Sequence, residues 1–160
     1  MQVLNLGCGE ETYGTCRVDA YPTKTTTHVF DVEKGLQFPD SFFDVVYEKN
    51  LLEHLRNPGF HLEEVFRVLK KGGKLILITD YAGCYRYYFF GTHEGRYEKK
   101  HKNNPEDKHY SIFSRQHLQN HLVKVGFLKI SVKLIKTDTK GRFLDAFTGD
   151  KPRLRAVAIK

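Results

Sequence analysis

The sequence lacks any apolar run approaching the roughly 20 residues that a membrane-spanning helix needs, and it shows no basic-then-apolar export signal. These two absences predict a cytoplasmic protein without a membrane span. Cysteine is scarce as well: the chain has 3, an odd number, and none forms a Cys-x-x-Cys pair. We therefore expect reduced thiols rather than disulfides or a thiolate zinc site.

Size and composition are those of one globular domain. The chain has 160 residues, of which 40% are hydrophobic and 13% aromatic, so we treat 1–160 as a single unit with one core. Lys and Arg number 26 against 19 Asp and Glu, a net charge of +7 that is concentrated after Arg96. This charge permits an anionic partner such as nucleic acid, but lysine-rich surfaces are too common for charge alone to favour one.

Short apolar segments that end in or near an acid recur in the first half of the chain. We expect strands at 3–6, 17–20, 28–31, 43–48 and 72–80, and the unbroken apolar centre of the last predicts burial on both faces. A short helix is expected at 50–55, ended by Asn57-Pro58. A longer one is expected at 60–70, with a basic last turn and a glycine stop at Gly72.

The second half has one long irregular stretch. Residues 81–113 are rich in aromatic and basic side chains and too long for an ordinary connection, so we expect a lid-like insertion. Ser114 is expected to cap a helix that ends at Gly126. An alternating strand at 127–135 and a closing strand at 153–160 should then pair as an antiparallel hairpin at one edge of a doubly wound α/β sheet.

The turn after the first strand is unusually short. Only ten residues, from Gly7 to Cys16, separate the first two strands, at or below the ~10 to 12 of a parallel crossover. A full crossover helix does not fit. Because a dinucleotide site uses that helix N-terminus to hold pyrophosphate, the pattern argues against a dehydrogenase.

Four segments follow one another in a characteristic order: "LNLGCG", "VDA", "FDVEKGLQFPDSFFDVVYEKNLLEHL" and "EEVFRVLKKGGKLILI". In order and spacing they resemble a class I S-adenosylmethionine-dependent methyltransferase, in a small, shortened subgroup of the methyltransferase type 11 domain. The resemblance implies a Rossmann-like, mostly parallel seven-stranded sheet with an antiparallel C-terminal hairpin, its first crossover helix shortened or absent. It also implies S-adenosylmethionine as the cofactor, whose sulfonium carries no phosphate and so does not need the missing helix.

The same resemblance implies a set of donor-binding residues. They are Gly7 and Gly9 in the turn under the methionine and ribose, Asp19 on the ribose hydroxyls, Asp31 and Val32 at the adenine, and Glu48 beside the methionine. Two of the acids have a structural alternative, because Asp19 could be a turn residue and Asp31 the N-cap of a one-turn helix.

Residues for the acceptor are less specific. His54 and His109 are candidates for a general base, since histidine titrates near neutrality, although a single histidine is more often structural. Tyr81 and Tyr110 border the lid and are candidates for substrate contact. His117 and His121 stand at i and i+4, as metal ligands do, but no third ligand is evident, so we expect no metal.

The sequence thus predicts a methyltransferase acting on a small-molecule or glycan-type acceptor. One alternative is a catalytically degenerate S-adenosylmethionine-binding domain that serves as a partner or regulatory subunit. Another is an RNA methyltransferase, which is not favoured because the Asn/Asp-Pro-Pro-aromatic motif of amino-directed nucleic-acid methylases is absent: Glu48-Lys49-Asn50-Leu51 stands in its place. A homodimer is the other partnership considered, and no membrane association is expected.

Overall fold

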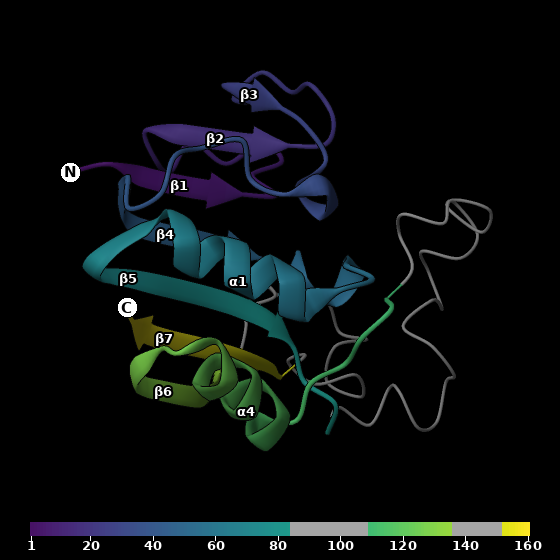
Figure 1. Cartoon of the computed structure of the whole chain (residues 1–160). Helices are drawn as coiled ribbons and strands as arrows, with labels where there is room; N and C mark the ends of the chain where they lie inside the picture. Colours follow the sequence, from purple (N-terminus) through teal and green to yellow (C-terminus); the bar gives the residue numbers. More distant parts are fainter. Residues whose placement is uncertain (84–108, 136–151) are drawn as a thin grey trace, which may run out of the picture.

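Figure 1 shows the computed structural model of the chain, which describes residues 1–83, 109–135 and 152–160. These residues form a seven-stranded sheet in the order β3-β2-β1-β4-β5-β7-β6. Neighbours from β3 to β5 are parallel, and β7 runs antiparallel to both β5 and β6. The strands are β1 (Val3–Leu6), β2 (Cys16–Asp19), β3 (His28–Val29), β4 (Phe43–Lys49), β5 (Leu69–Asp80), β6 (Leu128–Ile135) and β7 (Arg153–Ile159). The predicted mostly parallel α/β sheet with an antiparallel C-terminal pair is confirmed.

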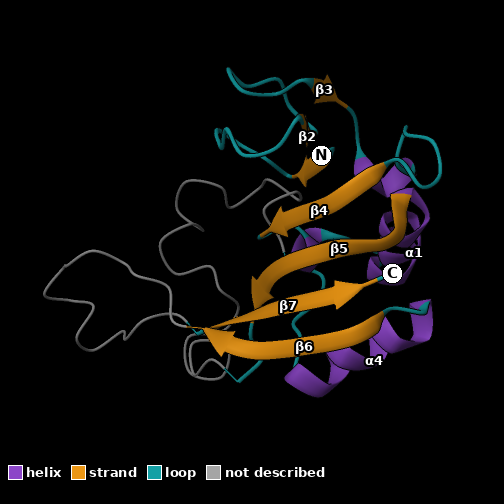
Figure 2. Cartoon of the chain, turned by 90° about the vertical axis from the view of Figure 1, so that its left-hand side faces the viewer, coloured by secondary structure: helices purple, strands orange, loops and turns teal. Residues whose placement is uncertain are grey.

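Two α-helices, α1 (Pro58–Val68) and α4 (Arg115–Val125), cover the same face of this sheet in the described part of the chain (Figure 2). Their apolar positions recur at helical spacing, and the side chains at these positions are buried with the inward residues of the strands. Two short 3-10 helices, η1 (Val32–Lys34) and η2 (Leu52–His54), follow β3 and β4. No helix among the described residues is long and apolar enough to span a membrane.

The boundary between α1 and β5 differs from the prediction. The helix ends at Val68, and Leu69 already has extended backbone and pairs with Phe43, so Gly72 is not a helix stop. The register between β4 and β5 shifts after this pair and resumes at Val45 with Lys74. The extra residues form a bulge. A basic run followed by glycine looks the same in sequence whether it ends a helix or bulges a strand.

The connection between β1 and β2 contains no helix, as predicted. It is held by its own polar contacts instead: the Asn5 amide donates to the Tyr13 carbonyl over 3.1 Å, and Thr15 donates its backbone N–H to Val3 over 2.9 Å. Gly14, at φ +100, makes the return turn where an added Cβ would crowd the Val3 carbonyl at 3.2 Å.

Other predicted elements match with shifted ends. The helix expected at 50–55 is the single 3-10 turn η2. Ser114 caps α4 through the His117 N–H, and Gly126 ends it in the left-handed conformation, as predicted. Of the expected lid, residues 84–108 lie outside the described part of the chain, so the lid and the single-domain assignment stay predictions.

Candidate functional site

The site lies at the carboxyl edge of the sheet, where β1, β2, β4 and β5 end. The strand order reverses between β1 and β4, since β2 and β3 lie on one side of β1 and β5 on the other side of β4. Open α/β sheets bind ligands in the crevice beyond such a switch point. The predicted donor residues follow β1, β2, β3 and β4 and therefore share this edge.

The glycine turn after β1 is shaped by two left-handed residues. Gly7 has φ +64 and packs against Leu51, which an added Cβ would meet at 3.3 Å. Gly9 has φ +51, and an added Cβ there would meet nothing within 4 Å. The turn thus touches the start of the η2 region on one side and leaves open space on the other.

Asp19 lies directly beside this turn. Its Oδ2 accepts the Gly9 backbone N–H over 2.8 Å, and its Oδ1 accepts the Tyr21 N–H over 3.2 Å. Each carboxylate oxygen has a second lone-pair direction for a further donor. Cys8 lies between Gly7 and Gly9, and its thiol is buried. This burial, with a smaller effect from the negative charge of Asp19, raises the pKa of the Cys8 thiol. Cys8 is therefore a packing residue rather than a nucleophile.

Asp31 caps the one-turn helix η1, the structural alternative considered for it. Its Oδ1 accepts the Glu33 N–H over 3.0 Å, and Lys34 lies 3.8 Å from Oδ2. The Asp31 side chain is still 44% exposed, so the cap leaves it reachable from solvent. The adjoining Val32 is buried in the core, and its backbone is what remains for a ligand contact.

Glu48 has a different environment from the one expected. Its side chain is 1% exposed, and its Oε2 lies 2.6 Å from His61 Nε2 on α1, whose side chain is equally buried. This pair lies between β4 and α1, and Glu48 is the strand partner of Leu6, the residue before the glycine turn. The other carboxylate oxygen, Oε1, is buried without a hydrogen-bond partner among the described residues, so a donor contact by Glu48 stays a prediction.

The next residue is Lys49, whose side chain lies on the face of β4 opposite to that of Glu48. Lys49, at the end of β4, donates to Glu11 Oε1 over 2.9 Å, and both side chains are 39% exposed. This ion pair links the end of β4 to the helix-free connection after β1. As an exposed pair it contributes little to stability.

The two histidines proposed for catalysis come together in space. Their rings lie edge to face with centroids 4.6 Å apart. The contact forms because the Tyr110 and Ser111 N–H groups both donate to the Glu53 carbonyl, over 2.9 and 3.2 Å, which fixes the segment after His109 against η2. His54 and His109 thus meet although they are distant in sequence.

Two buried acids adjoin this histidine pair. Glu53 is 1% exposed and its Oε2 accepts the Thr79 hydroxyl over 2.8 Å. Burial, reinforced by the negative charge of Asp80, raises the pKa of the Glu53 carboxyl to about 7. Asp80, at the end of β5, lies 3.5 Å from His109 Nδ1 and 3.7 Å from Arg153 Nε.

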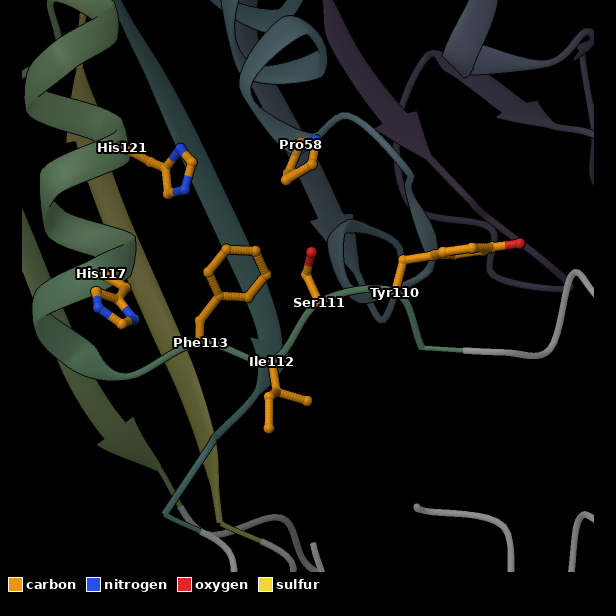
Figure 3. Close-up of a pocket in the computed structure, with 7 residues that line it drawn as sticks. All are labelled: Pro58, Tyr110, Ser111, Ile112, Phe113, His117 and His121. Atoms are coloured by element: carbon orange, nitrogen blue, oxygen red, sulfur yellow. The ribbon is translucent and has the colours of Figure 1, made fainter.

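The two tyrosines each follow a member of this cluster in sequence, Tyr81 after Asp80 and Tyr110 after His109. Tyr81 extends β5 through a bridge to Phe113. Tyr110 is 48% exposed, with the Arg56 guanidinium 5.6 Å from its ring centroid. A cavity of about 470 Å³ lies next to Tyr110, and the Tyr110 ring points away from the other residues that line it (Figure 3). Its walls are Pro58, Tyr110, Ser111, Ile112, Phe113, His117 and His121, with none of the predicted donor residues.

Comparison with known proteins shows what the chain resembles. Residues 4–77 match the methyltransferase domain family. This segment runs from β1 into β5 and contains all of the predicted donor residues, and the match indicates a methyltransferase. No curated protein matches its sequence.

Solved structures share the fold of this methyltransferase. An S-adenosylmethionine-dependent methyltransferase from Mesorhizobium loti is 20% identical, with a TM-score of 0.68 over 99% of this chain and 90% of that one. A Haloferax volcanii complex between the Trm112 methyltransferase activator and a methyltransferase gives 17% identity and a TM-score of 0.69 over 98% and 80%. Phosphoethanolamine N-methyltransferase 2 from Haemonchus contortus, in complex with S-adenosylmethionine, gives 16% and 0.65 over 99% and 48%.

The geometry of the methyltransferase fits its donor, S-adenosylmethionine. The open space beside Gly9 and the carboxylate of Asp19 lie together at the switch point, and the described connection from the glycine turn to β2 contains no helix whose N-terminus could hold a phosphate. The donor contains no phosphate and presents hydroxyl donors that a carboxylate can accept.

Sequence reasoning missed several polar residues of this methyltransferase. Glu53 adjoins the predicted His54, and Asp80 ends a strand with an acid as the donor strands do, so both carried a signal. Arg153 carried none, because only the strand pairing brings β7 beside the end of β5. Thr79 carried none either, because a threonine within an apolar strand is an ordinary β-branched residue.

Proposed function

We propose that this methyltransferase binds S-adenosylmethionine along the glycine turn, with Asp19 on the ribose and Asp31 and the Val32 backbone at the adenine. The observation that carries the proposal is the hydrogen bond from Gly9 to Asp19. It brings the flexible turn and the carboxylate together at the switch point of the sheet. Lys49 and Glu11 then border the methionine end.

We further propose that the acceptor is a small molecule or glycan-type compound, presented beside Glu53, His54 and His109. S-adenosylmethionine supplies a methyl group on a sulfonium, which passes to the acceptor as the carbon–sulfur bond breaks with its electron pair on sulfur. The protein has to align the acceptor and manage its proton. Contact between Leu51 and Gly7 supports this placement, because it brings the residues just before η2 against the donor turn.

A binding experiment tests the donor assignment. Calorimetric titration of S-adenosylmethionine and S-adenosylhomocysteine should show affinity reduced roughly 10- to 100-fold in Asp19→Ala, the equivalent of losing charge-assisted hydrogen bonds of about 1.5–3 kcal/mol. Asp40→Ala is the matched control, because Asp40 is exposed and pairs with Arg67 on α1. Equal affinity in wild type and Asp19→Ala would show that the donor binds elsewhere.

The acceptor class is tested by transfer of labelled methyl groups to fractions of a cell extract. Label in low-molecular-weight or glycan fractions supports the proposal. RNA is the second candidate, because the net charge of +7 permits an anionic partner. Label that enters RNA and disappears with ribonuclease would replace the first proposal with the second.

A further inference from the structure

Beyond the donor site, three residues form a group whose chemistry is that of a metal centre. One ligand atom each from Glu53, His54 and His109 lies within 4.8 Å of the others. Glu53 is fully buried, and the two histidines are partly buried. Two imidazoles and one carboxylate form a common ligand set for zinc and non-haem iron.

The distances between the three ligand atoms are close to those in an occupied metal site. Zinc bonds of about 2.0–2.2 Å place coordinated atoms about 3–4 Å apart, so the observed limit of 4.8 Å requires only a small side-chain rotation. The two histidine rings are already in contact, with centroids 4.6 Å apart. The backbone bonds from Tyr110 and Ser111 to Glu53 hold the distant histidine in place.

Neighbouring polar groups are arranged as the outer partners of a metal site are. The Thr79 hydroxyl donates to Glu53 Oε2 over 2.8 Å and so fixes the carboxylate. Asp80 Oδ2 lies 3.5 Å from His109 Nδ1. A carboxylate beside a ligating histidine is the usual device that orients its ring.

Charge favours a cation at the same place. Glu53 and Asp80 are each 1% exposed, and both carboxylates adjoin the histidine pair. Among the described residues, Arg153 lies 3.7 Å from Asp80, whereas the Glu53 carboxylate accepts a hydrogen bond from the neutral Thr79 hydroxyl. Burying two acids together is costly unless positive charge accompanies them.

From this geometry we propose that Glu53, His54 and His109 bind a divalent first-row transition-metal ion, Zn²⁺ or a similar cation, and that Asp80 and Thr79 orient the ligands. Among the histidines, the sequence-based expectation of no metal considered only His117 and His121. It did not consider this set, because His109 is distant in sequence from Glu53 and His54. Imidazole ligands favour such ions over Mg²⁺ and Ca²⁺, which prefer oxygen.

The ion would activate a hydroxyl group of the acceptor. This inference rests on the proposed methyl transfer. A hydroxyl bound to a divalent cation has a lowered pKa and releases its proton to solvent at neutral pH. Its oxygen then forms the new bond to the methyl carbon as the carbon–sulfur bond breaks toward sulfur. The expected acceptor is therefore an alcohol or phenol.

Cobalt titration of metal-stripped, untagged protein tests the site directly. We expect one Co²⁺ per chain, visible as ligand-field absorption and displaced by Zn²⁺, with affinity reduced at least ~10-fold in His54→Ala and in His109→Ala. Glu53→Gln keeps the shape of the buried side chain and should weaken binding similarly. Circular dichroism of each variant establishes that it is folded.

The chain supplies a matched control in His117 and His121, a pair at i and i+4 on α4 (Figure 3). The double variant His117→Ala, His121→Ala should bind Co²⁺ like wild type. No saturable binding, loss of binding in this control instead, or a strong sulfur-to-cobalt charge-transfer band would overturn the proposal. Titration of S-adenosylhomocysteine into metal-stripped protein separates the two ideas, because donor binding should persist without metal.

Discussion

Gly9 illustrates how one residue can serve both the fold and the donor. Its left-handed φ of +51 strains any side chain, and the space beside it is open. Gly9→Ala should therefore lower the free energy of unfolding by about 1 kcal/mol. It should also weaken donor binding, because the methyl group enters the space left beside the turn.

Gly72 provides the matched comparison for this substitution. It has φ +78, and an added Cβ there also meets nothing within 4 Å. Gly72 lies in the bulge near the amino end of β5, whereas the donor residues lie at the carboxyl ends of the strands. Gly72→Ala should cost similar stability in urea titrations and leave calorimetric donor affinity unchanged. If Gly9→Ala binds the donor with the same affinity as Gly72→Ala, the donor does not occupy the open space beside Gly9.

The buried pair of Glu48 and His61 predicts a large effect on stability. His61→Ala removes the partner of a carboxylate that is 1% exposed, which should cost about 3–5 kcal/mol in urea unfolding. His117→Ala, at an exposed position on α4, should change stability by no more than about 0.5 kcal/mol. A loss below 1 kcal/mol for His61→Ala would show that the pair does not hold α1 to the sheet.

At the scale of elements, the Arg67 side chain is a main link between α1 and the loop before β4. Arg67 donates to Glu64, Asp40 and the carbonyls of Leu36 and Phe38. Hydrogen bonding from Arg67 is the main cause that lowers the pKa of Glu64 from its ordinary 4.5. The folded state therefore releases this proton more readily than the unfolded state does.

This shift predicts the pH dependence of a variant. An acid whose folded pKa is lowered stabilises the protein above its unfolded pKa and loses that contribution as pH falls through the folded value. Arg67→Met should cost about 1–2 kcal/mol near neutral pH, and this difference from wild type should shrink below about pH 4.5. Urea titrations across that range measure it; a constant difference would mean that Glu64 does not mediate the effect.

The elements also show what the sequence could and could not predict. Alternation, caps and acid-ended strands were enough for the strands and for α4, because those signals are local. Period-two alternation even places Glu48 on the face of Val46, under α1, although the family resemblance directed attention to the donor instead. The meeting of His54 with His109 depends on backbone hydrogen bonds from Tyr110 and Ser111 to Glu53, between segments distant in sequence, which local patterns do not encode.

At the scale of the whole molecule, the last strand in sequence is an interior strand of the sheet. β7 lies between β5 and β6, and β6 pairs with no other described strand. Deleting 152–160 should therefore abolish cooperative urea unfolding, because it uncovers β5 and detaches β6. Arg155→Ala, an exposed change on the same strand, should unfold as wild type does; a truncated chain that still unfolds cooperatively would contradict this.

This strand order also determines which strands lack a pairing partner while the protein is being synthesised. Until the segment that forms β7 leaves the ribosomal exit tunnel, β5 has an unpaired hydrogen-bonding edge and β6 has no strand to pair with. Such an edge can recruit strands from other nascent chains. We therefore expect chaperone dependence to be greatest after α4 and β6 have been made and before β7 pairs with β5 and β6.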